Sequence, residues 1–138
     1  GNLPRPYIIT SPVYDAVDNT SLAGDDVVKL IDLPADSMVI GGTLEVLEAS
    51  GNAQITLDVG TSTDVDAFVD GGASNAAADI QFNLKAAGGN MVTSADSIQV
   101  TVLDSGSSGT TALRFRVHAV ICDVSVNPVE SATVSTGT

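Results

Sequence analysis

The feature that most constrains the fold is a strict alternation of side chains close to the C-terminal end. Over residues 113–122, apolar side chains recur at every second position: Leu113, Phe115, Val117, Ala119 and Ile121. A period of two is typical of a β-strand with one buried face. Residues 53–59, 80–84 and 97–102 repeat the pattern. We therefore expect strands that turn one face towards a shared core.

The same pattern, read along the whole chain, predicts about eight strands and no amphipathic helix. The predicted strands cover residues 7–10, 27–33, 38–48, 53–59, 80–84, 91–93, 97–102 and 113–122. Turn-forming residues separate them, and the segments 50–52 and 104–109 are predicted to close β-hairpins. Short strands at this spacing favour an all-β, jelly-roll-like antiparallel β-sandwich, with a barrel as the alternative.

The chain length of 138 residues is typical of one domain. Residues 1–6 contain two prolines and are predicted to form an extended N-terminal arm. Residues 7–126 are predicted to form the β-sandwich, and the Ser- and Thr-rich residues 127–138 a C-terminal tail. Within the sandwich, residues 60–75 read as a loop that the apolar insert 67–69 pins to the core.

Charge excludes two classes of partner. The chain has 17 acidic and 5 basic residues, for a net charge of −12. Phosphate backbones and anionic membrane surfaces would repel it, so we expect neither nucleic acid nor membrane as a partner. No signal peptide or bilayer-spanning run is recognised. The single cysteine, Cys122, cannot form an internal disulfide, which fits folding in a reducing cytoplasm.

The strongest catalytic candidate is Asp104, in the segment Val102-Leu103-Asp104-Ser105-Gly106. Two apolar residues before Asp-Ser-Gly resemble the active-site loop of aspartic proteases, in which two such loops share a proton. One copy per chain would require a homodimer, and the apolar-apolar-Gly segment of retroviral proteases is absent downstream. Because Asp, Ser and Gly are also the residues that turns require, the structural role is favoured.

Other titratable groups also favour structural roles. Asp58, Asp64, Asp66 and Asp70 could gather around Ca²⁺, although the EF-hand spacing fails and a solvated acidic loop is favoured. His118 is the only histidine and lies in the middle of a strand. Cys122 is expected to be a small buried hydrophobe. We therefore expect no catalytic residue, metal or cofactor.

The placement of positive charge indicates candidate contacts with a protein partner. Arg5 lies on the predicted arm, where Leu3 and Tyr7 are further candidate contacts, and Arg114 and Arg116 share one strand face. Arginine binds carboxylates in a bidentate geometry, so these side chains could anchor a neighbouring subunit. Pairing with acids of the same chain is the open alternative.

One stretch carries a resemblance to a known group of proteins. Residues Asp26 to Gly42, with the strand Val27–Leu33, Pro34 and a second strand, resemble the opening of small virion proteins of tailed bacteriophages. The segment Thr56–Asp64 and the closing strand Leu113–Val124 fit the same type. The resemblance covers about residues 25–126.

The resemblance implies a head decoration, or capsid cement, protein. Such proteins sit on the outside of an assembled shell, tie its capsomers together, use no cofactor and often act as trimers or dimers. The expected partner is therefore the major capsid protein, and the expected location is the capsid exterior after synthesis in the host cytoplasm. A tail- or fibre-associated component, such as an adhesin, is the alternative, and a homodimeric aspartic protease using Asp104 ranks third.

Overall fold

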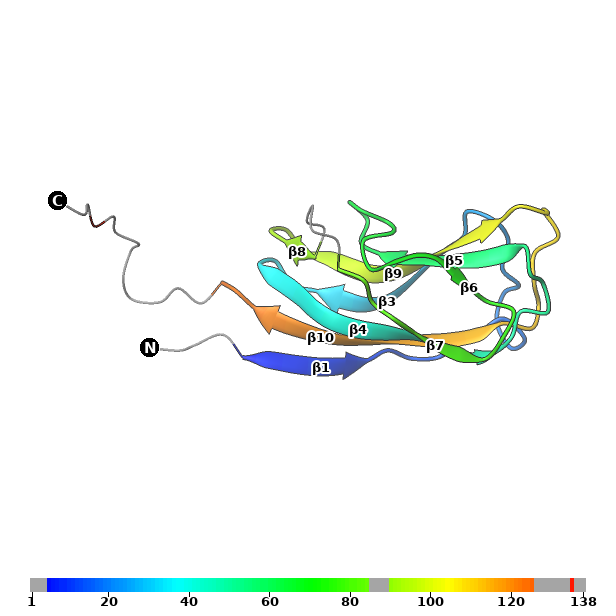
Figure 1. Cartoon of the computed structure of the whole chain (residues 1–138), viewed down its shortest axis with the longest axis horizontal. Coiled ribbons are helices and arrows are strands. Elements are labelled where there is room, and N and C mark those ends of the chain that lie inside the picture. Colours follow the sequence, from blue (N-terminus) through cyan, green and yellow to red (C-terminus); the bar gives the residue numbers. More distant parts are fainter. Residues whose placement is uncertain (1–4, 85–89, 126–134, 136–138) are drawn as a thin grey trace.

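Ten strands, arranged in two antiparallel sheets, make up the described part of this computed structural model, which covers residues 5–84, 90–125 and 135 (Figure 1). The strands are β1 (Pro6–Thr10), β2 (Tyr14–Asp15), β3 (Val27–Leu33), β4 (Ser37–Glu48), β5 (Ile55–Gly60), β6 (Val69–Ala73), β7 (Ala78–Gln81), β8 (Met91–Val92), β9 (Asp96–Asp104) and β10 (Arg114–Asp123). The described residues form no helix, and so none that could span a membrane.

The topology is that of a jelly roll. One sheet has the order β1-β10-β4-β7, with β2 beside β10 and β8 beside β4, and the other has the order β3-β9-β5-β6. Among these eight longer strands, the chain changes sheet at each connection except that between β5 and β6. Two layers whose eight longer strands are linked in this way form the double-sheet arrangement of viral capsid and lectin domains. The predicted all-β sandwich is confirmed.

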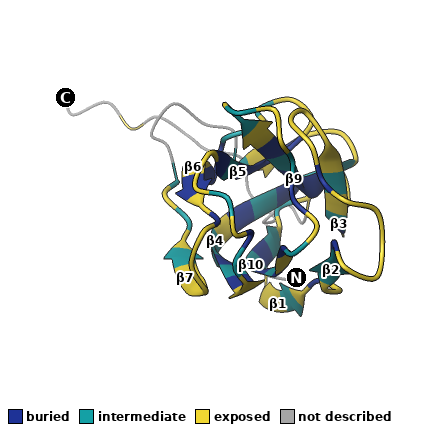
Figure 2. Ribbon diagram, turned by 90° about the vertical axis from the view of Figure 1, so that its right-hand side faces the viewer, coloured by how far each residue is buried: buried dark blue, intermediate teal, exposed yellow. Residues whose placement is uncertain are grey.

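The core lies between the two sheets and is built by the alternation seen in the sequence. All five apolar residues of the closing strand are buried, and Ile55, Leu57, Val59, Ile98, Val100 and Val102 face them from the other sheet. The two sheets thus enclose a continuous apolar layer, drawn in dark blue in Figure 2. Its area removed from water is the main stabilising term for the domain.

The strand predictions were largely correct, but strand pairing was not. Each predicted strand overlaps an observed one, while the five-residue strand β6 was missed inside the Gly-rich loop. The insert 67–69 is buried, so the prediction that it pins this region to the core is confirmed. The two predicted hairpins are wrong, because segments 50–52 and 104–109 carry the chain from one sheet to the other. Turn residues reverse the chain, but they do not choose the sheet that the next strand joins.

Gly41 and Gly42 lie beside a bulge in β4. The register of β10 against β4 shifts by one residue there, since Val120 pairs with Gly41 and Ile121 with Val39. A Cβ atom on Gly42 would lie 2.4 Å from Cε2 of Phe82 and 2.5 Å from the carbonyl oxygen of His118. The absent side chain thus lets the Phe82 ring rest against the strand.

The predicted arm and tail lie mainly beyond the described residues. Of the arm, only Arg5, which is exposed, and Pro6, the first residue of β1, are described. Leu3 lies outside the described residues. Of residues 127–138, only Ser135 is described, and it is exposed.

Candidate interaction surface

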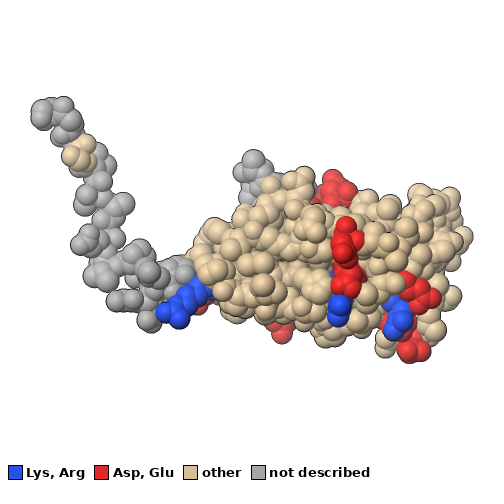
Figure 3. Space-filling view, turned by 60° about the horizontal axis from the view of Figure 1, so that its bottom comes forward, with Lys and Arg blue, Asp and Glu red and all other residues tan. Residues whose placement is uncertain are grey.

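The outer face of the β1-β10-β4-β7 sheet is divided into a charged half and an apolar half. Along β10 the outward side chains change from Arg114, Arg116 and His118 to Val120 and Cys122. Figure 3 looks towards this side of the molecule and shows basic atoms beside acidic ones within a broad uncharged surface. The two halves offer different chemistry to a partner.

Ionic and hydrogen-bonded contacts fill the charged half. Glu45 accepts hydrogen bonds from Arg116 at 3.1 Å (Nε to Oε1) and 3.3 Å (Nη2 to Oε2), and lies 2.8 Å from Nε2 of His118. Nδ1 of His118 lies 2.8 Å from the hydroxyl of Thr10. These contacts lower the pKa of Glu45 below its ordinary value, first through the hydrogen bond from His118 and then through that from Arg116. The network joins β1, β10 and β4.

Arg114 also pairs within the chain. Its Nε lies 3.0 Å from a carboxylate oxygen of Asp15, on β2, and 4.0 Å from one of Glu48, on β4. Both arginines singled out in the sequence therefore bind acids of their own chain, which is the alternative that the sequence left open. About half of the Arg114 side chain still faces solvent, so a further carboxylate could reach it.

The apolar half contains side chains that the sequence did not indicate as contacts. One of them is Cys122, and the expectation that it is buried is wrong, because it lies on the outward face of β10 and is partly exposed. We call it the apolar patch and define it as Ile8, Met38, Ile40, Met91, Val120 and Cys122. Strand pairing sets Ile8 beside Val120, and Cys122 beside Met38, which in turn pairs with Met91. Ile8 is 74% exposed, and Ile40 and Met91 are 44% and 45% exposed. Apolar groups that stay this accessible are a candidate protein contact.

Tyr7 does not share a face with the arginines. It pairs with Ile121, whose side chain is buried in the core, and it lies at the rim of the sandwich, 39% exposed. The sequence offered one signal for Ile8, because the stretch Tyr7-Ile8-Ile9 is apolar on both faces of a strand. When a strand is buried on one face only, the apolar side chains of its other face stay exposed.

Three of the four acids proposed for Ca²⁺ come together. Carboxylate oxygens of Asp58, Asp66 and Asp70 all lie within 4.8 Å of one another, a spacing that could hold a cation. Asp58 is buried and accepts a hydrogen bond from the amide of Gly71 at 2.7 Å. Asp64 is not part of this group and instead shapes the loop, where its carbonyl accepts the amide of Thr61 at 2.9 Å.

Asp104 closes the loop between β9 and β10. Its two carboxylate oxygens accept the amides of Gly109 at 2.7 Å and Gly106 at 2.9 Å. These hydrogen bonds, the one from Gly109 first, lower the pKa of Asp104. They lie across a loop in which Ser107 and Gly109 both have positive φ angles. The loop geometry thus accounts for the Asp-Ser-Gly sequence without a catalytic role.

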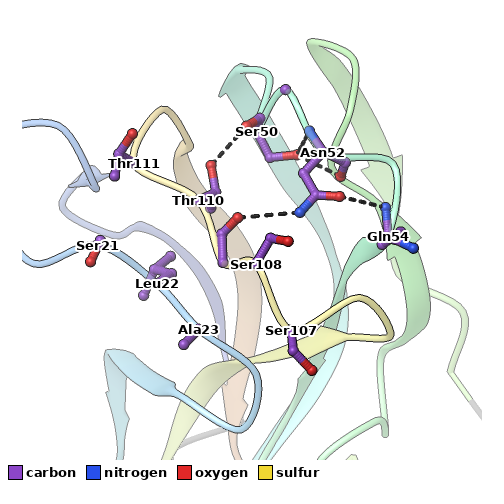
Figure 4. Close-up of a pocket in the computed structure, with 12 residues that line it drawn as sticks. Ser21, Leu22, Ala23, Ser50, Asn52, Gln54, Ser107, Ser108, Thr110 and Thr111 are labelled. Atoms are coloured by element: carbon purple, nitrogen blue, oxygen red, sulfur yellow. Dashed lines mark hydrogen bonds between the residues drawn. The ribbon is translucent and has the colours of Figure 1, made fainter.

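Two surface hollows among the described residues are candidate ligand sites. A depression of about 590 Å³ lies where three loops meet (Figure 4). Its polar side chains join these loops. Thr110 donates a hydrogen bond to the carbonyl of Ser50 at 2.7 Å, and Asn52 donates one to the carbonyl of Gly109 at 3.2 Å. A groove of about 440 Å³ lies beside β6 and β7. Of the residues that line it, Phe68 is 1% exposed and stacks on Phe82. Its ring is therefore not open to stack on a sugar, as the tail-adhesin alternative would require.

Comparisons with known proteins give relatives by structure alone. No family model and no curated protein matches the sequence. A chain in the capsid asymmetric unit of cyanophage Pam1 superposes with a TM-score of 0.62 at 17% identity, over 88% of this chain and 87% of that one. The shared property is the fold.

Two further phage capsid structures contain similar chains. The match in the capsid of Ralstonia phage GP4 has a TM-score of 0.58 at 18% identity and covers 86% of this chain and 81% of that one. The match in the acid-stable capsid of Helicobacter pylori bacteriophage KHP30 has a TM-score of 0.59 at 14% identity and covers 94% and 100%. Each match spans nearly the whole of both chains, so the likeness concerns the complete sandwich.

Proposed function

We propose that this chain is a virion structural protein that binds the outer surface of an assembled phage capsid and stabilises it. The observation that carries the proposal is the near-complete superposition on a chain of a phage capsid, over 88% of this chain and 87% of the other. Two more capsids contain chains of the same fold and similar extent. A decoration protein would reach its effect through binding alone, which agrees with a surface divided into charged and apolar contacts.

Charge supports the outer surface rather than the inner one. A net charge of −12 would repel packaged DNA, which carries a phosphate on every nucleotide. On the outside, the same charge keeps the free protein soluble before it binds. The major capsid protein is the proposed partner, with contacts at Leu3, Arg5, Tyr7, Arg114 and Arg116.

The proposed mechanism is mass action. A protein that binds only the assembled lattice adds its binding free energy to the stability of that lattice. Many symmetric copies let a modest contact act through multivalency. No bond is made or broken, so the role needs no cofactor.

The test compares phage particles assembled with and without this protein. We expect electron microscopy to show added density on the capsid exterior only when the protein is present, and particles lacking it to release DNA at a lower temperature. Adding the purified protein back should restore heat tolerance. Density confined to the tail, or equal heat tolerance of both particles, would contradict the proposal, and the first result would favour the tail-associated alternative.

A further inference from the structure

One edge strand differs from the others in how it is protected against pairing. Within the described residues, the longer strands that end the sheets are β1, β7, β3 and β6, and the two-residue strands β2 and β8 continue the edges of β1 and β7. Charged side chains lie in three of these, as Asp79 in β7, Lys29 and Asp32 in β3, and Asp70 in β6. Register shifts also distort the pairing of β3 and β6. Charges, bulges and prolines are the usual devices against edge-to-edge pairing. The strand β1 has no charge and no bulge, and the prolines, Pro6 and Pro12, stand only at its start and just past its end.

The backbone of β1 presents a defined set of hydrogen-bonding groups to its open edge. The amide of Ser11 donates to the carbonyl of Val117, on β10, at 2.8 Å. In an antiparallel pair, the groups of every second residue point to the same neighbour, so those of Ile9 and Tyr7 also point to β10. The amide and carbonyl of Ile8 therefore point away from β10, to the open edge.

Prolines limit this edge to two donors. Ile8 and Thr10 both present an amide outward. Pro6 and Pro12 are the next residues on either side whose backbone would point outward, and neither has an N–H. A long partner strand would thus face missing donors at both ends. A short strand centred on Ile8 would not.

We propose that β1 pairs antiparallel with β1 of a second copy of this chain, around a two-fold axis at Ile8. In this register Ile8 faces Ile8 of the second copy and exchanges two hydrogen bonds with it. Each Thr10 amide meets the carbonyl of Pro6 of the second copy, so every outward donor is used. Pro6, which has no N–H, faces the carbonyl of Thr10 of the second copy. The sheet then runs continuously through both molecules.

The side chains fit the same register. Ile8, 74% exposed in the single chain, packs against its counterpart and extends the apolar patch across the axis. Tyr7 faces Ile9 of the second copy, and an aromatic side chain opposite a β-branched one is a favourable cross-strand pair. Arg5 faces Ser11, so no like charges oppose each other.

Charge also favours β1, rather than other parts of the surface, as the contact between two copies of the chain. Two chains of net charge −12 repel each other, and a contact between them is least opposed where neither carries charge. The segment Pro6–Thr10 is uncharged, and its outer neighbours Val120 and Ile40 are apolar. A two-fold pairing of β1 thus brings together uncharged segments of both molecules.

The test measures the mass of the full-length protein in solution by sedimentation velocity over a range of concentrations. We expect a dimer that Ile8→Lys weakens by about tenfold or more, because two lysines would face each other at the axis. The matched control is Val17→Lys, which adds the same charge at a loop residue that is 59% exposed, and it should remain dimeric. Circular dichroism checks that both variants fold.

Cross-linking tests the register. In a Cys122→Ser background, Ile8→Cys should form a disulfide-linked dimer on oxidation, because directly opposed residues lie within disulfide reach. Thr10→Cys should not, since its two sites would be about 13 Å apart. A monomer at all concentrations, a trimer, or a dimer that Ile8→Lys leaves unchanged would overturn the inference. Binding to capsids is measured separately, so either proposal can fail while the other holds.

Discussion

Glu45 and Arg116 lie opposite each other on β4 and β10, and the guanidinium donates to both oxygens of the carboxylate, at 3.1 and 3.3 Å. His118 shares the same carboxylate and also contacts Thr10 of the edge strand. One acid thus connects three strands on the outer face. This arrangement makes the response of the sheet to acid predictable.

Glu45→Gln should lower the melting temperature at neutral pH and flatten its dependence on acid pH. The pKa of Glu45 is lowered in the folded protein from the ordinary 4.5, so its contribution is complete above that pH and is lost as the pH falls through the lower folded value. Thermal unfolding between pH 7 and pH 2 checks this. Equal acid dependence of variant and parent would contradict it.

Asp104→Asn should destabilise the loop between β9 and β10. The amide side chain keeps one acceptor oxygen, whereas the carboxylate serves the amides of both Gly106 and Gly109. Ser108→Ala, in the same loop, keeps those backbone amides and should unfold like the parent. Melting temperatures of the three proteins decide the point.

Asp104 also allows the protease alternative to be tested. We expect no peptide cleavage by the parent protein at acidic pH, because the loop amides already engage both carboxylate oxygens of Asp104. The measurement is a cleavage assay with a mixed peptide library. Cleavage that disappears in Asp104→Ala would show that the structural interpretation is incomplete.

Gly42→Ala should destabilise the protein by about 1–3 kcal/mol, because the new methyl group meets both the Phe82 ring and the backbone of β10. Gly41→Ala is the matched control, since a Cβ there has no atom within 4 Å. Urea unfolding of both variants measures the difference. If the two variants lose equal stability, the close packing of Phe82 is not the cause.

Arg114→Ala should change stability by less than about 1 kcal/mol, because the arginine side chain is about half exposed and ion pairs open to solvent contribute little. Its effect on attachment to capsids can therefore be assigned to the contact itself. If Arg114 binds the major capsid protein, the variant should dissociate from particles faster than the parent. Co-sedimentation with particles over a range of salt concentrations measures this, and unchanged retention would remove Arg114 from the contact.

The sequence predicted only part of the candidate surface. Arg114 and Arg116 were recognised because charge is visible in any sequence, but their acids lie on other strands and could not be assigned. Asp58, Asp66 and Asp70 were among four acids that the sequence offered for a cation, but a solvated acidic loop was favoured, and only the tertiary structure brings these three together. Ile8 was not selected, because an apolar residue in a strand is ordinarily read as core.

What the sequence alone determined is the identity of the strands and the side chains that each turns inward. A period of two is a local property, and burial of one face follows from it wherever a core forms. Only the tertiary structure decided which strands pair, that the turns at 50–52 and 104–109 cross between sheets, and that β1 ends a sheet with Ile8 exposed. Those outcomes depend on contacts between distant residues, and no local pattern encodes them.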